Sequence, residues 1–107
     1  MKLIVKPIIR IAPHSYTLLF NEHLTADEEK VGTINRRTQV IEIDSNLAPT
    51  QKEVTFWHEV FHELDHHFSL RINDDVVENL AVGITQFLQE NFDIELDFSE
   101  IPIKTTP

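Results

Sequence analysis

The spacing of apolar residues changes along the chain, and each change marks a different kind of predicted element. Residues 3–11 and 16–21 are rich in β-branched and aromatic side chains, and residues 31–35 and 39–43 form two further runs of this kind. Such runs are typical of strands, and the last two are close enough in sequence to form a hairpin. Pro7 predicts an edge strand or an irregular start in the first run, because proline lacks the N–H that a central strand donates.

From residue 50 onward the spacing becomes helical. Apolar residues recur at intervals of three and four, which places them along one face of a helix. Thr50 precedes Glu53 by three residues, the spacing of a capping box, and predicts that the helix begins there. We expect the stripe to be buried; its members are Val54, Trp57, Phe61, Leu64 and Phe68.

A second helix is predicted to begin near Asn73 or Asp74 and to end near Asn91. Acidic residues in a first turn favour such a start because they interact with the positive end of the helix dipole. Residues 92–98 then alternate apolar and acidic side chains, which indicates a half-buried strand or a docking segment, and residues 101–107 are expected to be frayed. The apolar face of the helix comprises Val77, Leu80, Ala81, Ile84, Phe87 and Leu88.

Length and composition narrow the functional classes. The 107 residues fit a single domain, and the net charge of −9 argues against a nucleic-acid-binding surface, which needs clustered Lys and Arg. The absence of cysteine excludes disulfides, thiolate ligands and a cysteine nucleophile, and it fits a reducing compartment. Lys6, Pro7 and Arg10 interrupt the apolar N-terminus, which therefore predicts neither a signal segment nor a membrane span. We expect a cytoplasmic protein that binds no membrane.

The segment His58-Glu59-Val60-Phe61-His62 carries the most specific chemical signal, the pattern H-E-x-x-H on a predicted helix. Residues four apart lie on nearly the same helical face, so His58 and His62 can bind one zinc ion together. Glu59 can then reach a zinc-bound water without being a ligand and take its proton during attack on a carbonyl group. The alternative interpretation is an acidic helix whose histidines are solvated or packed in the core.

A catalytic zinc site usually has three protein ligands and one open position. Glu78 is the predicted third ligand, because it lies early on the second helix, which a short connection makes an antiparallel neighbour of the first. Asp65, three residues after His62, could instead orient a ligand imidazole through its other ring nitrogen. Glu78 could also belong to a capping box with Asp75. The competing third ligands are His66, His67, Asp74 and Asp75.

Metal-assisted hydrolysis also requires a donor that stabilises the developing oxyanion. The sequence alone does not rank the side chains that could supply it. These candidates are Tyr16, His14, His23, His66, His67, Arg36 and Arg37.

The chain resembles the small zincin metallopeptidases, namely minimal gluzincins and the ImmA/IrrE-like peptidases often found in phage and mobile elements. The resemblance covers about residues 16–91 and rests on the run 40–44, the helix 58–65 and Glu78-Asn79-Leu80-Ala81. It implies an α+β fold with a short antiparallel sheet of about three strands, an active-site helix and a second antiparallel helix. It also implies zinc on His58, His62 and Glu78, with Glu59 as general base. Residues 92–107 would then form a C-terminal strand or tail.

Two classes of function follow from these observations. The first is a zinc-dependent peptidase whose protein or peptide substrate lies extended along a sheet edge. The second is a latent or non-catalytic module in which zinc stabilises a small core and the protein binds a partner. In a variant of the second, residues 92–98 dock in the cleft and inhibit the enzyme.

Overall fold

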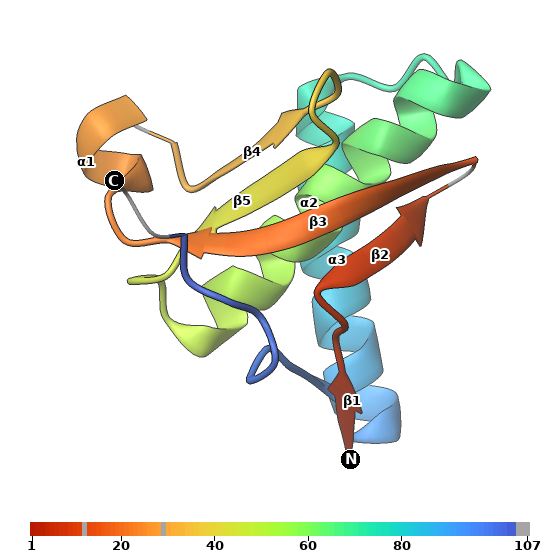
Figure 1. The fold of residues 1–107 in the computed structure, drawn as a ribbon. Coiled ribbons are helices and arrows are strands. Elements are labelled where there is room, and N and C mark those ends of the chain that lie inside the picture. Colours follow the sequence, from red (N-terminus) through yellow and green to blue (C-terminus); the bar gives the residue numbers. More distant parts are fainter. Residues whose placement is uncertain (12, 29, 105–107) are drawn as a thin grey trace.

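The computed structural model of the protein describes residues 1–11, 13–28 and 30–104 (Figure 1). Six strands and three helices are found in these residues. In chain order they are β1 (Lys2–Ile4), β2 (Ile8–Ile11), β3 (His14–Asn21), α1 (Leu24–Glu28), β4 (Gly32–Asn35), β5 (Val40–Asp44), α2 (Pro49–Phe68), α3 (Asp74–Phe92) and β6 (Glu95–Asp97).

Four of the strands form a mixed sheet in the order β2-β3-β5-β4. The predicted hairpin is confirmed, because β4 and β5 pair antiparallel, with Gly32 opposite Ile43. The expected antiparallel sheet of about three strands is wrong in two respects, since there is a fourth strand and β3 pairs with β5 in parallel. The parallel pairing arises because α1 and β4 return the chain to the starting end of the sheet before β5 begins.

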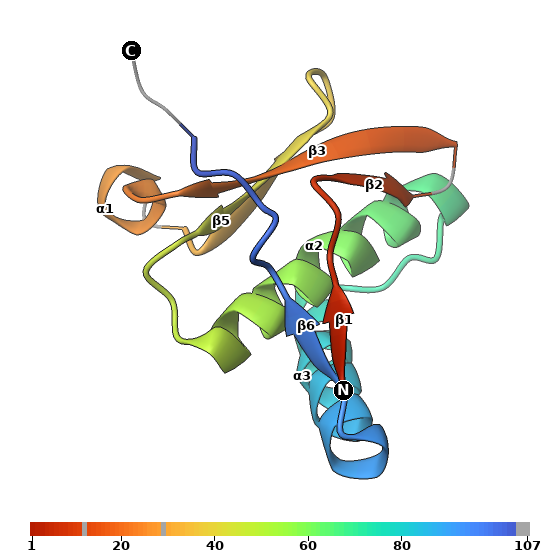
Figure 2. The ribbon, with the colours of Figure 1, turned by 60° about the horizontal axis from the view of Figure 1, so that its bottom comes forward.

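Strand β1, near the N-terminus, pairs in parallel with β6, which follows α3, and the two form a second, smaller sheet (Figure 2). The alternating tail therefore does contain a strand, shorter than the pattern predicts. Ile101 is buried, and Ile103 forms a bridge with Phe20 of β3. Backbone hydrogen bonds with Phe20 thus hold residues 102–104, which are not frayed as expected, while residues 105–107 lie outside the described part of the chain.

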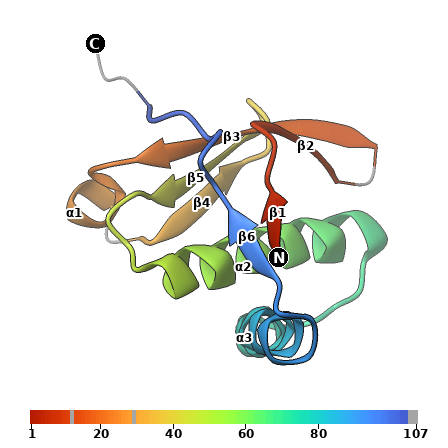
Figure 3. The ribbon, with the colours of Figure 1, turned by 90° about the horizontal axis from the view of Figure 1, so that it is seen from below.

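The elements are stacked as sheet, α2 and α3 (Figure 3). Alternate residues of a strand point to one face, and in β3 these are Tyr16, Leu18 and Phe20, all buried against α2. Helix α3 packs on α2 rather than on the sheet. No helix within the described residues is both long and apolar enough to cross a lipid bilayer. The core cluster comprises Val5, Ile11, Tyr16, Leu18, Phe20, Ile41, Ile43, Phe56 and Ile101.

Helix α2 begins one residue before the predicted start and caps differently. Its N-cap is Ala48, whose N–H donates to the Gln51 side chain over 3.3 Å. The carboxylate of Glu53 instead accepts a 3.0 Å hydrogen bond from the N–H of Leu96 in β6, so the predicted capping box is wrong. Through this hydrogen bond, Glu53 holds β6 against α2.

The predicted apolar stripe of α2 is not its most buried face. Phe68 is 60% exposed, and the other members of the stripe are only half-buried. The buried side instead carries Phe56 together with the carboxylates of Glu59 and Glu63. Acids occupy this position because one borders a cavity and the other is hydrogen-bonded, as described below.

Helix α3 begins as predicted. Asn73 is its N-cap, and the Asn73 side chain accepts a 2.9 Å hydrogen bond from the N–H of Val76. Of the predicted apolar face, Val77 and Ala81 are fully buried, whereas Leu80 and Phe87 are about half exposed. The helix therefore buries a narrower face than its sequence predicts.

Candidate metal centre and active site

The two histidines of the H-E-x-x-H segment meet on one side of α2. Their Nε2 atoms lie 2.9 Å apart. Two nitrogens bound to one tetrahedral zinc at about 2.0–2.1 Å would lie about 3.3 Å apart. Burial, and then the neighbouring His58, lower the pKa of His62, which favours the neutral imidazole that a metal binds. The spacing of the two imidazoles suits a shared divalent metal.

Helix α3 brings two carboxylates to this pair. Oε2 of Glu78 lies 2.7 Å from Nδ1 of His58, and Oδ1 of Asp74 lies 3.6 Å from Nε2 of His62. Glu78 therefore contacts the ring nitrogen of His58 that points away from His62. Within the residues that the structure describes, no three His, Cys, Asp or Glu side chains converge as a ready-made ligand group.

The donor set nevertheless suits zinc in kind, since two imidazoles and a carboxylate are typical zinc ligands. The imidazole pair is already in place. The Glu78 side chain is 52% exposed and would have to turn from Nδ1 of His58 toward the Nε2 atoms. In its observed position Glu78 orients the His58 ring, as an outer carboxylate does for a metal-bound histidine.

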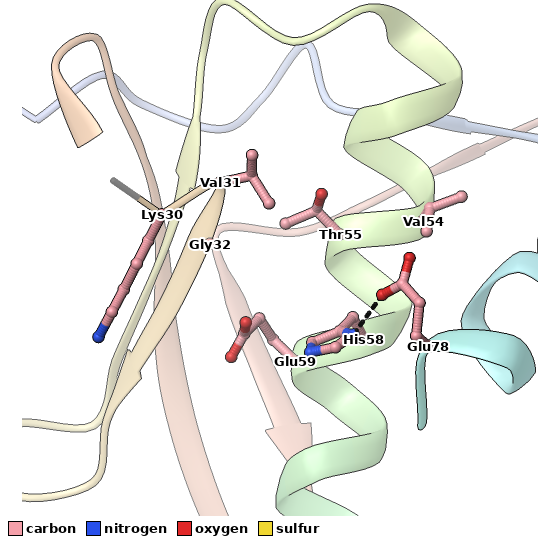
Figure 4. Close-up of a pocket in the computed structure, with 8 residues that line it drawn as sticks. All are labelled: Lys30, Val31, Gly32, Val54, Thr55, His58, Glu59 and Glu78. Atoms are coloured by element: carbon pink, nitrogen blue, oxygen red, sulfur yellow. Dashed lines mark hydrogen bonds and ion pairs between the residues drawn. The ribbon is translucent and has the colours of Figure 1, made fainter. Parts of the chain in front are cut away.

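Glu59 is almost fully buried, at 6% exposure, yet it borders a cavity (Figure 4). Burial raises the pKa of its carboxyl group, opposed by the charges of His58 and Lys30. No hydrogen bond engages the Glu59 side chain within the described residues, and none of its oxygens is a buried atom without a partner. Its carboxylate oxygens are therefore free to act on a molecule in the cavity.

The cavity has a volume of about 350 Å³ and lies between α2, the start of β4 and α3. A second cavity of about 330 Å³ shares four of its residues and extends along α2 toward Leu47 and Val82. Together they form one groove with a more apolar end. The first is lined by Lys30, Val31, Gly32, Val54, Thr55, His58, Glu59 and Glu78.

Gly32 allows β4 to lie close to α2. A Cβ built on Gly32 would lie 2.5 Å from Cγ2 of Thr55 and 3.3 Å from Oε1 of Glu59. Real Cβ atoms do not approach other heavy atoms to 2.5 Å, so only glycine lets the strand lie here without displacing Thr55. Since β4 is an edge strand, this close packing places an unpaired strand edge along the groove.

A second polar cluster surrounds Glu63, which is fully buried one turn after Glu59. Glu63 accepts hydrogen bonds from the hydroxyl of Tyr16 and, over 2.9 Å, from Nε of Arg36. Nε2 of His67 lies 3.2 Å from the same carboxylate. Burial and the contact with Glu63 raise the pKa of Tyr16 to about 12. Three of the oxyanion candidates are thus gathered around one buried acid, with His14 beside His67.

Sequence reasoning missed Glu63 as the centre of this cluster. Its spacing of four residues from Glu59 was the available signal, because it places both acids on one helical face. Two of the partners of Glu63, Tyr16 and Arg36, come from β3 and from the turn after β4, far away in the sequence, so no local pattern reveals them.

The remaining candidates lie outside the site. Oδ1 of Asp65 accepts a hydrogen bond from the N–H of Ile72 over 3.2 Å and so stabilises the connection to α3 rather than a ligand imidazole. His66 is exposed on α2 and Asp75 is exposed on α3. His23 and Arg37 lie in exposed turns, where their backbone N–H groups donate to asparagine side chains.

The C-terminal segment does not occupy the groove. Residues 95–97 pair with β1, and none of residues 92–98 lines either cavity beside Glu59. The expectation that this segment docks in the cleft as an inhibitory strand is therefore wrong. Its backbone pairs with β1, and the N–H of Leu96 donates a hydrogen bond to Glu53, so the segment is held away from the groove.

Comparison with protein-family models, with curated proteins and with solved structures finds no match. The chemistry of the site is therefore inferred from its own residues.

Proposed function

We propose that this protein is a zinc-dependent metallopeptidase that hydrolyses peptide bonds. The observation that carries the proposal is the pairing of two convergent imidazoles, His58 and His62, with an unbonded, buried carboxylate, Glu59, at the wall of a groove. A carboxylate kept free of hydrogen bonds beside a metal-binding histidine pair is the arrangement that general-base hydrolysis requires.

His58, His62 and Glu78 would hold the zinc, with Asp74 as the alternative carboxylate. When bound, zinc would polarise the scissile carbonyl and lower the pKa of water in the site. Glu78 has the freedom to take part because its side chain is half exposed and, among the described residues, is hydrogen-bonded to His58 alone.

Glu59 would take the proton from the attacking water and return it to the leaving amine. Its raised pKa favours this exchange, because a base must accept the proton and later release it. The walls of the groove, formed by Val31 and Thr55 beside Glu59, limit access of bulk water to the carboxylate.

The substrate would lie extended along β4, whose outer edge has no partner strand in the described sheet. The apolar continuation of the groove, between Leu47, Val54 and Val82, would take an aliphatic side chain next to the scissile bond.

Arg36 is the best-supported oxyanion donor among the candidates. Its Nε is fixed on Glu63 over 2.9 Å, and its charge acts on both Glu59 and His62. Its side chain is 46% exposed, so the terminal nitrogens remain accessible to a substrate. Tyr16, by contrast, is buried, and its hydroxyl already donates a hydrogen bond to Glu63.

The test is the zinc content of the purified protein, measured with cleavage of a fluorogenic peptide library. We expect about one zinc per chain, with zinc much weakened in His62→Ala and in Glu78→Ala, and peptide cleavage that a chelator abolishes. Zinc retained in Glu78→Ala but lost in Asp74→Ala would move the third ligand to Asp74. A protein that binds no zinc after reconstitution would exclude the metallopeptidase.

A second candidate function is a zinc-stabilised, non-catalytic binding module. It is favoured by Asp74, whose Oδ1 lies 3.6 Å from Nε2 of His62, because Asp74 together with His58, His62 and Glu78 would make up the four protein ligands of a structural zinc. Here zinc would raise the thermal stability of the protein while no peptide in the library is cleaved. Cleavage that depends on Glu59 would eliminate this candidate.

A further inference from the structure

The groove beside Glu59 has two chemically different ends. The second cavity adds Leu47 and Val82 and is therefore apolar at its far end. The first cavity adds Lys30 at the end beside Glu59, and Lys30 does not line the second cavity. Among the described residues that line either cavity, Lys30 is the only lysine or arginine. The groove thus offers an aliphatic wall at one end and a primary amine at the other.

The position of Lys30 is set by the start of β4. The next residue, Val31, accepts a 2.9 Å hydrogen bond from the N–H of Asp44, which ties this part of the backbone to β5. In Figure 4 the carboxylate of Glu59 lies between the amine of Lys30 and the ring of His58, and the charges of both residues act on it. The amine therefore lies on the side of Glu59 away from His58.

None of the ion pairs found in the described part of the chain involves Lys30. Arg36, whose charge also acts on Glu59, differs because it is paired with Glu63. The Lys30 side chain is exposed and lines the groove, so its amine can reach a bound molecule. A carboxylate bound there would give this compact charge a partner between walls that exclude part of the water, which strengthens an ion pair.

We propose that Lys30 selects the substrate by binding a carboxylate of the peptide, which is either an Asp or Glu side chain or the C-terminal carboxylate. This inference rests on the proposed peptidase function and adds the substrate class. Because Lys30 and the apolar wall lie at opposite ends of the groove, the selected peptides carry the carboxylate and an aliphatic residue on opposite sides of the scissile bond. Lys30 contacts the substrate but not the reacting atoms.

The test measures kcat/KM of the zinc-loaded protein on fluorogenic peptides with blocked ends. All of them share a leucine for the apolar wall, and the residues across the scissile bond are replaced one at a time by Asp, Gln or Lys. We expect the Asp peptide to be cleaved about fivefold faster than the Gln peptide at one position, with the Lys peptide slowest, and the preference to shrink as salt is added. A second pair of peptides ends beyond the scissile bond in a free carboxylate or in an amide. The series that shows the preference identifies the source of the carboxylate.

Three substitutions assign the preference to Lys30. Lys30→Met keeps the length of the side chain without its charge, so the preference should fall to within about twofold, whereas Lys30→Arg should retain it. The matched control is Lys6→Met, which removes an exposed lysine that lines neither cavity and should leave the preference unchanged. A role limited to the charge of Glu59 would shift the pH profile of all peptides alike in Lys30→Met and leave the preference intact, which would refute the proposal.

A binding measurement separates this proposal from the peptidase itself. Fluorescence anisotropy on Glu59→Gln gives the affinities of the carboxylate and amide peptides without cleavage, and adding Lys30→Met should remove the difference between them. Should the wild type cleave no peptide while this difference is found, the peptidase is wrong and the carboxylate site stands. Cleavage without any preference for a carboxylate, or a preference for the Lys peptides, leaves the peptidase standing and excludes the role of Lys30.

Discussion

Two buried glutamates lie one turn apart on α2 and have opposite surroundings. Glu63 is fully buried and is bound by Tyr16 and Arg36. Glu59 is 6% exposed, borders the groove and has no hydrogen bond within the described residues. A buried carboxylate without partners is destabilising, whereas one with several donors stabilises the elements that supply them.

The difference assigns separate roles to the two acids. Glu63 joins β3, the turn after β4 and α2 through one carboxylate, so its role is to hold the sheet on the helix. Glu59 stabilises nothing by hydrogen bonding, and its burial raises its pKa. Carboxyl groups whose pKa is shifted by burial beside a cleft occur often at functional sites. The following predictions test this contrast.

Replacing Glu59 by Gln should produce the largest effect, and it should reduce peptidase activity without changing stability. We expect peptide cleavage to drop by about 10²–10⁴-fold, because the amide cannot accept the proton of water. Zinc content and the free energy of unfolding should remain close to those of the wild type. Glu53→Gln, on the same helix but away from the groove, is the control and should still cleave. Undiminished cleavage by Glu59→Gln would refute the role of general base.

Replacing Glu63 by Ala should instead lower the free energy of unfolding. The substitution leaves Arg36 and Tyr16 without their buried hydrogen-bond partner, and because Arg36 is 46% exposed we expect a loss of about 1–3 kcal/mol. Urea unfolding followed by circular dichroism measures the loss. Glu63→Gln keeps the size of the side chain and should lose less. A change below about 1 kcal/mol in Glu63→Ala would mean that the cluster does not hold the sheet on the helix.

Gly32→Ala tests the close approach of β4 to the groove. Its Cβ would displace Thr55 and crowd Glu59, so we expect a loss of about 1–3 kcal/mol in stability together with lower activity. Thr55→Ser removes the methyl group that the new Cβ would meet at 2.5 Å. The double variant should therefore recover much of the loss. If it recovers nothing, the strain lies elsewhere.

Replacing Asp44 should produce the smallest change in stability, and that change should depend on pH. Burial raises its pKa, but hydrogen bonds from Thr25 and Asn46 outweigh burial, and the net pKa lies below 3.8. Because the folded pKa is the lower one, the stabilisation is fully present above pH 3.8 and is lost as the pH falls through the folded pKa. Thermal unfolding of the wild type and of Asp44→Asn between pH 2 and 6 measures it. The difference between the two proteins should shrink below pH 3.8; a constant difference would contradict the assignment.

Local patterns predicted the elements that depend on neighbouring residues. The hairpin of β4 and β5 and the start of α3 at Asn73 were correct, because they follow from strand alternation and side-chain capping. The meeting of His58 and His62 was also predictable, since helical periodicity alone places residues four apart together.

The capping box at Thr50 and the buried stripe of α2 were wrong for a shared reason. The Glu53 carboxylate accepts a hydrogen bond from the N–H of Leu96 in β6, a residue far from α2 in the sequence. The buried face of α2 was decided by the sheet, which offered donors to Glu63 and left a groove beside Glu59. Helical periodicity gives the faces of a helix but does not say which one will meet the sheet.

The amino-acid sequence by itself therefore determined the histidine pair, the adjacent Glu59 and the two long helices, because the backbone repeat sets these relations within a few residues. Only the tertiary structure decided that β3 and β5 run parallel, that Glu63 gathers Tyr16 and Arg36, and that Glu78 contacts His58. These relations join residues separated by twenty positions or more. They depend on packing that buries apolar surface and satisfies polar groups over the whole chain at once.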